Sequence, residues 1–252
     1  MALPKEPRQK MINIMYLVLT ALLAINISAE ILNAFKTINE SLEKTNAAVN
    51  ASTSQIIASL AQKLNDPATR DRAAIWKPKA DQVAGYAKET YDYIESLKKE
   101  IIAASTSGDQ LKEDDQNATT RILVKEGKGK QLLEMLKKYK GSVLGTDSLI
   151  SNAFTNNFAV NLDPPKSQNS NKKSWEEAYF YMSPTVGALS ILSKFQNDVR
   201  TSENKVVTFC HEQVGKVEVV FDSYAAIVGQ NSNYLMPGQK IEIKAGIGAF
   251  SK

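Results

Sequence analysis

An uncharged apolar run near the N-terminus, MINIMYLVLTALLAINISA, occupies residues 11–29 and limits what this chain can fold into. A helix rises about 1.5 Å per residue, so this run is long enough to cross a hydrocarbon core of about 30 Å. The rest of the 252-residue chain has the composition of a soluble protein. The run therefore predicts a single transmembrane helix at residues 11–29, attached to a large polar body.

Basic residues before the apolar run set its expected orientation. Lys5, Arg8 and Lys10 precede the run, and Glu30 is the first acidic residue after it. Positive residues stay on the cytoplasmic side of a membrane span. We therefore expect residues 1–10 to be cytoplasmic and the rest of the chain to lie across the membrane.

A cleaved signal peptide is the alternative interpretation of this N-terminus, with Ile27-Ser28-Ala29 as a weak cleavage site. The apolar run, however, is longer than the usual signal core of about 7 to 15 residues. Apolar residues also continue at helical spacing beyond Ala29, through Ile31, Phe35 and Ile38. We therefore expect a retained anchor whose helix continues unbroken into the soluble body.

One side of the predicted span carries polar and small residues. At about 100° per residue, a single sector of the helix contains these residues: Asn13, Tyr16, Thr20, Ala24 and Ser28. Such a seam lets another membrane helix approach closely and share hydrogen bonds. The alternative is that Tyr16 and Thr20 bond back to their own helix.

Arg8 lies immediately before the apolar run and has two interpretations. It is either one more positive anchor whose guanidinium reaches the lipid headgroups, or a partner for a carboxylate inside another protein's membrane bundle. The residues alone favour the headgroup anchor.

The body of the chain is predicted to be mainly α. Apolar spacing, caps and breakers divide residues 30–216 into an elongated antiparallel helical bundle. The predicted helices cover residues 30–65, which end at Asp66-Pro67, then 79–104 after Lys77-Pro78, 131–139, 146–158 with a cap at Thr146 or Asp147, and 183–215. Residues 105–117 and 163–174 are predicted loops.

The periodicity changes after the last helix. Val217, Val219 and Phe221 alternate with polar residues, Tyr224 to Val228 is apolar, and Ile241 and Ile243 follow a turn at 236–239. Alternation of this kind is typical of β-strands. We expect residues 217–252 to be the start of a β-rich domain that this chain does not complete.

Composition argues against several functions. The net charge of +4 is small and the lysines are scattered among acids, so we do not expect nucleic-acid binding. Cys210 and His211 are the single cysteine and histidine, too few for a metal site or for the usual catalytic arrangements. We interpret them as a buried thiol beside a surface imidazole. Glu176-Glu177 is expected to be a solvated first helical turn, so neither enzyme activity nor a cofactor is predicted.

Two segments resemble a known family. LPKEPRQKMINIMYLVLTALLAINISAEILNAF and SPTVGALSILSKFQNDVRTSENKVV are similar to the GldM family, also called PorM. This family belongs to the type IX secretion and gliding machinery of Bacteroidetes-type bacteria. The resemblance implies an inner-membrane protein with one span, a helical first periplasmic domain, and β-sandwich domains that reach towards distal periplasmic and outer-membrane components.

The resemblance also implies partners and roles. Family members work as a homodimer whose two spans sit inside a pentameric GldL or PorL ring, and the assembly uses the proton-motive force as a motor. Arg8 matches the family arginine that meets a glutamate of the ring, and Tyr16 matches a membrane tyrosine of the family. Protonation of the glutamate would release Arg8, so proton passage could drive rotation.

Two other classes remain as alternatives. A membrane-anchored sensor, adhesin or other periplasmic ligand-binding protein without a motor role also suits one span followed by long helices. A sensor normally carries a cytoplasmic output domain, whereas only about ten residues precede this span. A periplasmic enzyme is the weakest alternative.

Overall fold

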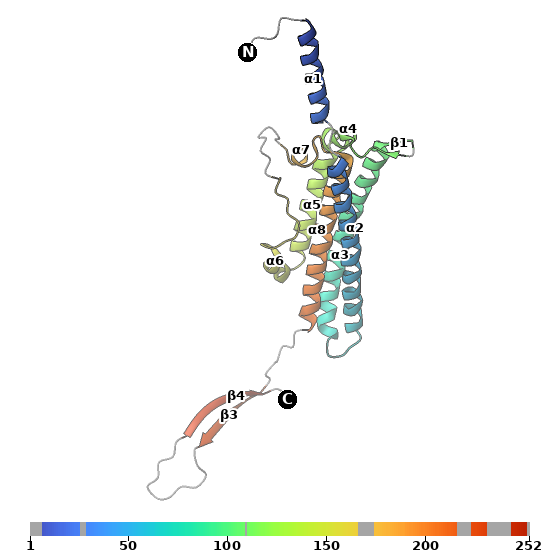
Figure 1. Ribbon diagram of the computed structural model, residues 1–252. Helices are drawn as coiled ribbons and strands as arrows, with labels where there is room; N and C mark the ends of the chain where they lie inside the picture. The colour runs from blue at the N-terminus through green and yellow to red at the C-terminus, as the bar shows by residue number, and fades with distance from the viewer. Residues whose placement is uncertain are drawn as a thin grey trace, which may run out of the picture. The chain divides into compact units, whose positions relative to one another are not determined.

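The computed structural model describes residues 7–25, 29–108, 110–165, 174–215, 223–230 and 243–250. The described chain is mainly helical, as predicted (Figure 1). It divides into two compact units, Met1–Val214 and Gly215–Lys252.

The first unit contains five helices of 18 residues or more among its described residues: α1 Pro7–Ile25, α2 Ala29–Lys63, α3 Arg70–Ser105, α5 Lys128–Gly145 and α8 Thr185–Gly215. Shorter elements connect them: β1 Thr106–Ser107, β2 Gln110–Leu111, α4 Gln116–Thr119, the π-helix η1 Thr120–Lys125, α6 Ser148–Phe154 and α7 Trp175–Phe180. Strands β1 and β2 pair as a short antiparallel hairpin.

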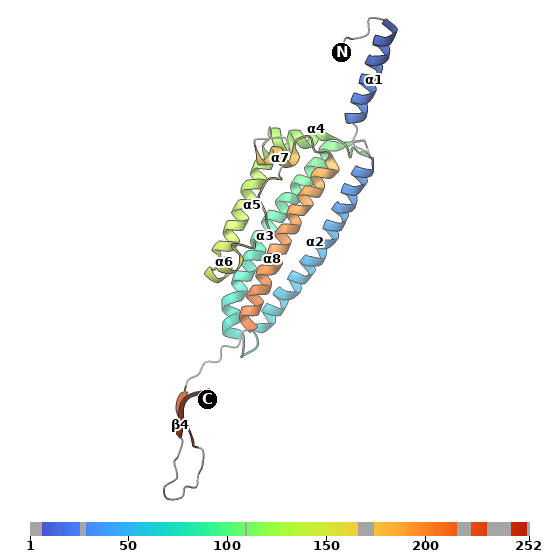
Figure 2. The ribbon, with the colours of Figure 1, turned by 60° about the vertical axis from the view of Figure 1, so that its left-hand side comes forward.

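Helix α8 lies among α2, α3 and α5 (Figure 1 and Figure 2). Seventeen of its 31 residues are buried, whereas α2 has three buried residues among 35. The apolar residues that recur at helical spacing in α8 are all buried: Val186, Leu189, Leu192, Phe195, Val199, Val206, Val207 and Cys210. Because fully burying one large apolar side chain contributes about 1.5–3 kcal/mol, α8 supplies much of the stability of the bundle.

The bundle is not antiparallel throughout, so that part of the prediction was wrong. Helices α3 and α5 run in opposite directions, since Lys128 pairs with Glu100 and Lys138 with Glu89. Helices α2 and α8 run in the same direction, because their contacts advance together from Phe35–Ser190 to Ser59–His211. After α6, the described chain comes back to α7 by Asp163, whose carbonyl oxygen accepts a hydrogen bond from Tyr179. Helix α8 then starts at the same end of the bundle as α2.

An aromatic cluster closes one end of the core. Trp175 and Tyr179 of α7 pack against Phe195 of α8, with ring centroids 5.5 and 5.4 Å apart. The Trp175 indole nitrogen donates to the Leu162 carbonyl oxygen, and the Tyr179 hydroxyl donates to the Asp163 carbonyl oxygen. The cluster therefore ties the returning connection to α8.

Helix α3 begins nine residues earlier than predicted, with Pro78 inside it. Proline removes one backbone hydrogen bond and normally ends a helix. Here Ala73, Trp76 and Ala80 surround Pro78 in sequence and are buried in the core. Tertiary packing of this face of α3 therefore offsets the free-energy cost of the hydrogen bond that Pro78 removes. The predicted stop at Asp66-Pro67 is confirmed, since α2 ends at Lys63.

Local capping explains the shorter helices. Asp147 caps α6 by accepting a hydrogen bond from the Leu149 amide, as one of the two predicted caps. Ser174 and Glu177 form a capping box at α7, which places Glu176 and Glu177 in the first turn as expected. Helices α4 and η1 were not predicted, because their few residues do not fill a periodic pattern.

The second unit contains two strands among its described residues, β3 Ser223–Gln230 and β4 Ile243–Phe250. They pair antiparallel, from Ser223 opposite Phe250 to Gln230 opposite Ile243. The apolar segment 224–228 lies in β3, as predicted. The expected alternation at 217, 219 and 221, Ile241 and the turn at 236–239 lie outside the described residues.

We predict that Pro78→Ala stabilises the bundle. Pro78 is exposed, so alanine loses no packing and restores a helical hydrogen-bond donor. We expect the free energy of unfolding to rise by about 1–3 kcal/mol, measured by urea unfolding followed by circular dichroism. The control is Pro67→Ala in the α2–α3 turn, where proline limits the unfolded chain and its removal costs up to about 1 kcal/mol. A loss of stability in Pro78→Ala would contradict this account.

Candidate functional site

Helix α1 presents a surface that a soluble protein does not leave open. Its large apolar side chains are exposed from Met11 to Leu19, by fractions between 42% for Ile12 and 75% for Met11. Contiguous exposed apolar surface of this kind marks a site that contacts another protein or a membrane. The helix is therefore the first candidate functional element.

The expected polar seam is partly described. Asn13, Tyr16 and Thr20 all lie on exposed positions of α1. The Thr20 hydroxyl donates to the carbonyl oxygens of Tyr16 at 2.7 Å and Leu17 at 3.0 Å, which agrees with the back-bonding alternative for this residue. The Tyr16 side chain is 65% exposed.

The other two seam residues are Ala24 and Ser28. Ala24 belongs to α1, but its side-chain surroundings lie outside what the structure describes, and so does Ser28 altogether. Packing of the seam against another helix stays a prediction.

Arg8 lies in the first turn of α1 and is exposed. This first turn contains no acidic residue. A cation at a helix N-terminus is opposed by the helix dipole, at a cost of about 0.3–1 kcal/mol. The helix dipole therefore does not stabilise the charge of Arg8. Its two interpretations, a headgroup anchor and a partner for a carboxylate, both stay predictions.

The predicted membrane span is not found in the described residues. Over these ranges, no helix combines the length and apolar character needed to cross a membrane. Helix α1 covers residues 11–25 of the predicted span, and residues 26–28, where the unbroken helix was expected, lie outside the described residues.

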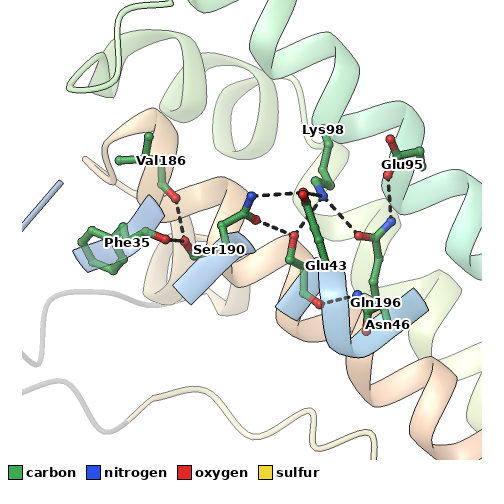
Figure 3. Close-up of polar contacts among 10 residues, drawn as sticks. Phe35, Glu43, Asn46, Glu95, Lys98, Val186, Ser190 and Gln196 are labelled. Atoms are coloured by element: carbon green, nitrogen blue, oxygen red, sulfur yellow. Dashed lines mark hydrogen bonds and ion pairs between the residues drawn. The ribbon is translucent and has the colours of Figure 1, made fainter. Parts of the chain in front are cut away.

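The second candidate element is the junction that holds α2 to the bundle. The contacts of α2 are mainly polar in its first half. Its second half adds apolar contacts, since Leu60 is buried and Ile56 and Ile57 pack against the core. It also keeps hydrogen bonds with Asn204 and His211 of α8. In the first half, Lys98 of α3 is the central group (Figure 3). Its exposed fraction is 6%, which is rare for a lysine.

The Lys98 ammonium has an acceptor for each of its three N–H groups. Its Nζ lies 2.9 Å from Glu43 Oε1 of α2, 2.9 Å from Ser193 Oγ and 3.3 Å from Gln196 Oε1 of α8. Gln196 in turn donates through Nε2 to Glu95 Oε2 at 3.0 Å. One buried cation therefore joins three helices.

Further hydrogen bonds extend this network along α2. The Ser193 hydroxyl donates to Asn39 Oδ1 at 2.6 Å, and Asn39 Nδ2 donates to Glu43 Oε1 at 3.0 Å. Asn197 Nδ2 donates to Asn46 Oδ1 at 3.0 Å. Because these bonds need matched partners, they fix the register of α2 against α8.

The charge of Lys98 changes the acidity of Glu43. Partial burial raises the pKa of Glu43, but the hydrogen bond and charge of Lys98, together with Asn39, outweigh burial and leave this pKa below its ordinary value. Glu43 is therefore ionised at neutral pH.

The sequence carries a signal for this junction that the spacing of apolar residues does not reveal. Polar residues recur at helical spacing in both helices, at Asn39, Glu43 and Asn46 of α2 and at Ser190, Ser193, Gln196 and Asn197 of α8. Two matched polar stripes indicate a polar helix–helix contact. The burial of Lys98 could not be predicted, because it depends on the distance between α2 and α8.

A second buried ionic group lies further along α8. Arg200 Nη1 is 2.9 Å from Glu203 Oε2, and the guanidinium lies over the Tyr91 ring at 4.4 Å. Burial raises the pKa of Glu203 in spite of Arg200. The pair connects α8 to α3.

Cys210 and His211 do not form a site with each other. Cys210 is fully buried, which raises the pKa of its thiol to about 12, and His211 Nε2 lies 3.0 Å from Ser59 Oγ of α2. Among the described residues, no group of His, Cys, Asp and Glu is arranged to hold a metal ion.

We predict that Lys98→Ala lowers the free energy of unfolding by about 2–3 kcal/mol, because it leaves Gln196 and Ser193 short of a donor and opens a cavity. Lys98→Met fills the space and should cost less. Urea unfolding of the chain in mild detergent measures both. The control is Lys88→Met on the same helix, whose exposed pair with Asp92 should be worth less than about 1 kcal/mol. Equal effects at the two positions would contradict the role of Lys98.

A pH series isolates Glu43. Because its folded pKa is lowered, ionised Glu43 stabilises the fold above its unfolded pKa of about 4.3, and this stability is lost as the pH falls through the folded value. We therefore expect the stability difference between wild type and Glu43→Gln to be largest near pH 7 and to vanish at strongly acidic pH. Asp198 and Glu203, whose raised pKa values act in the opposite direction, are present in both proteins and cancel.

Comparison with known proteins gives one family. A profile described as GldM N-terminal domain matches residues 30–212, which is well over half of the 252-residue chain. The matched region runs from the start of α2 almost to the end of α8 and contains the whole polar junction. No curated protein matches the chain significantly.

Proposed function

The chain belongs to the GldM family of gliding motility and type IX secretion components, and on that premise we propose that it is an energy-transducing subunit of the secretion motor. It is anchored in the inner membrane by residues 11–29, with its N-terminus in the cytoplasm and its helical bundle in the periplasm. It acts mechanically rather than as an enzyme.

The observation that carries this proposal is the exposed apolar surface of α1 with Arg8 at its start. Met11, Ile14 and Leu17 are each more than 60% exposed, so the helix needs an apolar surrounding. Lipid and the membrane helices of a partner both supply one. A passive anchor needs neither an exposed tyrosine nor a serine-, threonine- and asparagine-bearing side.

Arg8 supplies the point of coupling to protons. An ionised glutamate of a GldL-type ring attracts its guanidinium through a charge-assisted hydrogen bond, and a protonated glutamate releases it. Proton flow through the ring thus changes which ring subunit holds the helix. Two helices cannot satisfy five equivalent sites together, so the mismatch favours rotation.

Helix α2 carries the motion into the periplasm. It begins at Ala29, four residues after α1 ends at Ile25, and runs for 35 residues along the bundle. The Lys98 network holds its first half to α3 and α8. Displacement of α1 would therefore move the bundle as a body rather than peel α2 away.

The dimer forms through α1 and the first turns of α2. Ile31 and Ile38 are exposed by about half, seven residues apart on one side of α2. A second copy of the same helix can cover such positions with its own. The bundles of the dimer transmit motion to distal periplasmic and outer-membrane components through domains that follow β3 and β4.

We predict that Arg8→Gln abolishes gliding or type IX secretion while the protein remains in the membrane at normal levels. Glutamine keeps the polarity of the position but removes the charge that the ring glutamate must hold. Secretion assays and membrane fractionation of cells carrying the variant measure the two quantities. Lys10→Gln is the matched control and should retain function, because it leaves Arg8 in place.

Normal secretion by Arg8→Gln would overturn the motor role of this residue. It would favour a membrane-anchored periplasmic ligand-binding or adhesion protein, in which residues 1–10 serve only for orientation.

A further inference from the structure

The end of the bundle at which α2 begins also contains α4, α7 and the β1–β2 hairpin (Figure 1). Thr185, the first residue of α8, donates through its hydroxyl to Ser105 Oγ at the end of α3 and to the Asp115 carbonyl oxygen before α4. Helix α7 and η1 meet at the same end, where the Met182 amide donates to Thr120 Oγ1 at 3.0 Å.

The parallel register of α2 and α8 shows which residues of the two helices lie at the same height along the bundle. The Ser190 hydroxyl donates to the Phe35 carbonyl oxygen at 2.8 Å, so residues of the two helices that differ by 155 in number (190 − 35) are level. Pro184 is then level with Ala29, where α2 begins. Tyr181 and Met182, which precede Pro184 in the chain, therefore lie at the end of the bundle where α2 begins.

The turn between α7 and α8 holds apolar side chains outwards. Tyr181 is 49% exposed and Met182 is 51% exposed. Met182 has φ 54°, a left-handed conformation that is disfavoured for residues with a side chain. The Thr120 hydroxyl and the fully buried Phe180 ring hold the turn in place. A strained backbone that exposes apolar groups points to a function for them.

Exposed large apolar residues are concentrated at this end of the bundle. Outside α1, the described ones are Ile31, Ile102, Tyr181 and Met182 near this end, Ile38 two turns further along α2, and Ile75 and Leu149 elsewhere. Charges of both signs accompany them, including Lys112, Glu113 and Asp114. The end is therefore neither basic nor acidic.

We propose that the α7–α8 turn rests on the phospholipid surface, with Tyr181 and Met182 in the boundary between headgroups and acyl chains. Tyrosine is enriched at this boundary because its ring is apolar and its hydroxyl is polar. The mixed charge means that the contact does not need anionic lipid. With α1, the turn gives the bundle a second attachment that limits its tilt. This inference rests on the membrane anchoring proposed above and extends it.

Site-directed nitroxide labels test the proposal in the full chain, reconstituted into phosphatidylcholine vesicles. Labels are placed by Met182→Cys, by Leu149→Cys as an equally exposed control on α6, and by Val18→Cys in α1. Cys210 is fully buried, so the unmodified chain should not label, which is checked directly. Accessibility to oxygen, which dissolves in lipid, is compared with accessibility to a water-soluble nickel chelate.

We expect the ratio of oxygen to nickel accessibility at position 182 to exceed that at position 149 several-fold, and to approach the ratio at position 18. If position 182 matches position 149 while position 18 is in lipid, the surface contact is overturned and the anchor stands. A label at 182 that is shielded from both probes indicates protein coverage and also overturns it. If position 18 is itself in water, the membrane anchor and this inference both fail. Unchanged circular dichroism of Met182→Cys establishes that the bundle is folded.

Discussion

The burial of α8 is the constraint on which the rest of the bundle depends. With more than half of its residues buried, α8 can be stable only when α2, α3 and α5 cover it. Each neighbour makes at least one polar contact with α8. Tyr139 of α5 is buried and donates to the Val199 carbonyl oxygen, α3 contributes Lys98 and the rows of apolar side chains, and the first half of α2 is held by hydrogen bonds. Helix α8 runs parallel to α2 because the chain has come back to the end where α2 begins before α8 starts.

The polar character of the α2 junction has a mechanical meaning. An apolar contact tolerates sliding, because no atom requires a particular partner, whereas the Lys98 ammonium, Ser193 and Asn39 each require theirs. The junction is therefore selective in register. In the motor we propose, α2 is the element that follows the membrane helix, so a contact that resists sliding is suited to carry force into the bundle. The second half of α2 adds apolar contacts to its hydrogen bonds with Asn204 and His211, so it contributes stability as well as register.

The sequence predicted most of the helices but not how their faces meet. The apolar spacing of α8 identified its buried positions, and Asp66-Pro67 identified the end of α2, because both are local effects of periodicity and chain stiffness. The start of α3 was predicted nine residues too late, because Pro78 was interpreted as a helix breaker. The burial of Trp76 and its neighbours keeps the helix continuous through this proline. In the candidate site, Arg8 and the seam residues were proposed from their positions just before and within an apolar run. Lys98 was not, because a lysine among helical residues ordinarily lies in solvent.

What the sequence determined by itself is the set of local properties: an uncharged apolar segment at residues 11–29, long amphipathic helices, a change to strand periodicity after residue 216, and a single cysteine next to a single histidine. These properties depend only on residue type and spacing, so they do not depend on how the chain folds. The tertiary structure alone decided that α2 and α8 are parallel, that three helices share the Lys98 ammonium, and that Tyr181 and Met182 lie at the end of the bundle where α2 begins. Those facts depend on which distant segments lie side by side, and that is settled by the burial of α8 and not by any local pattern.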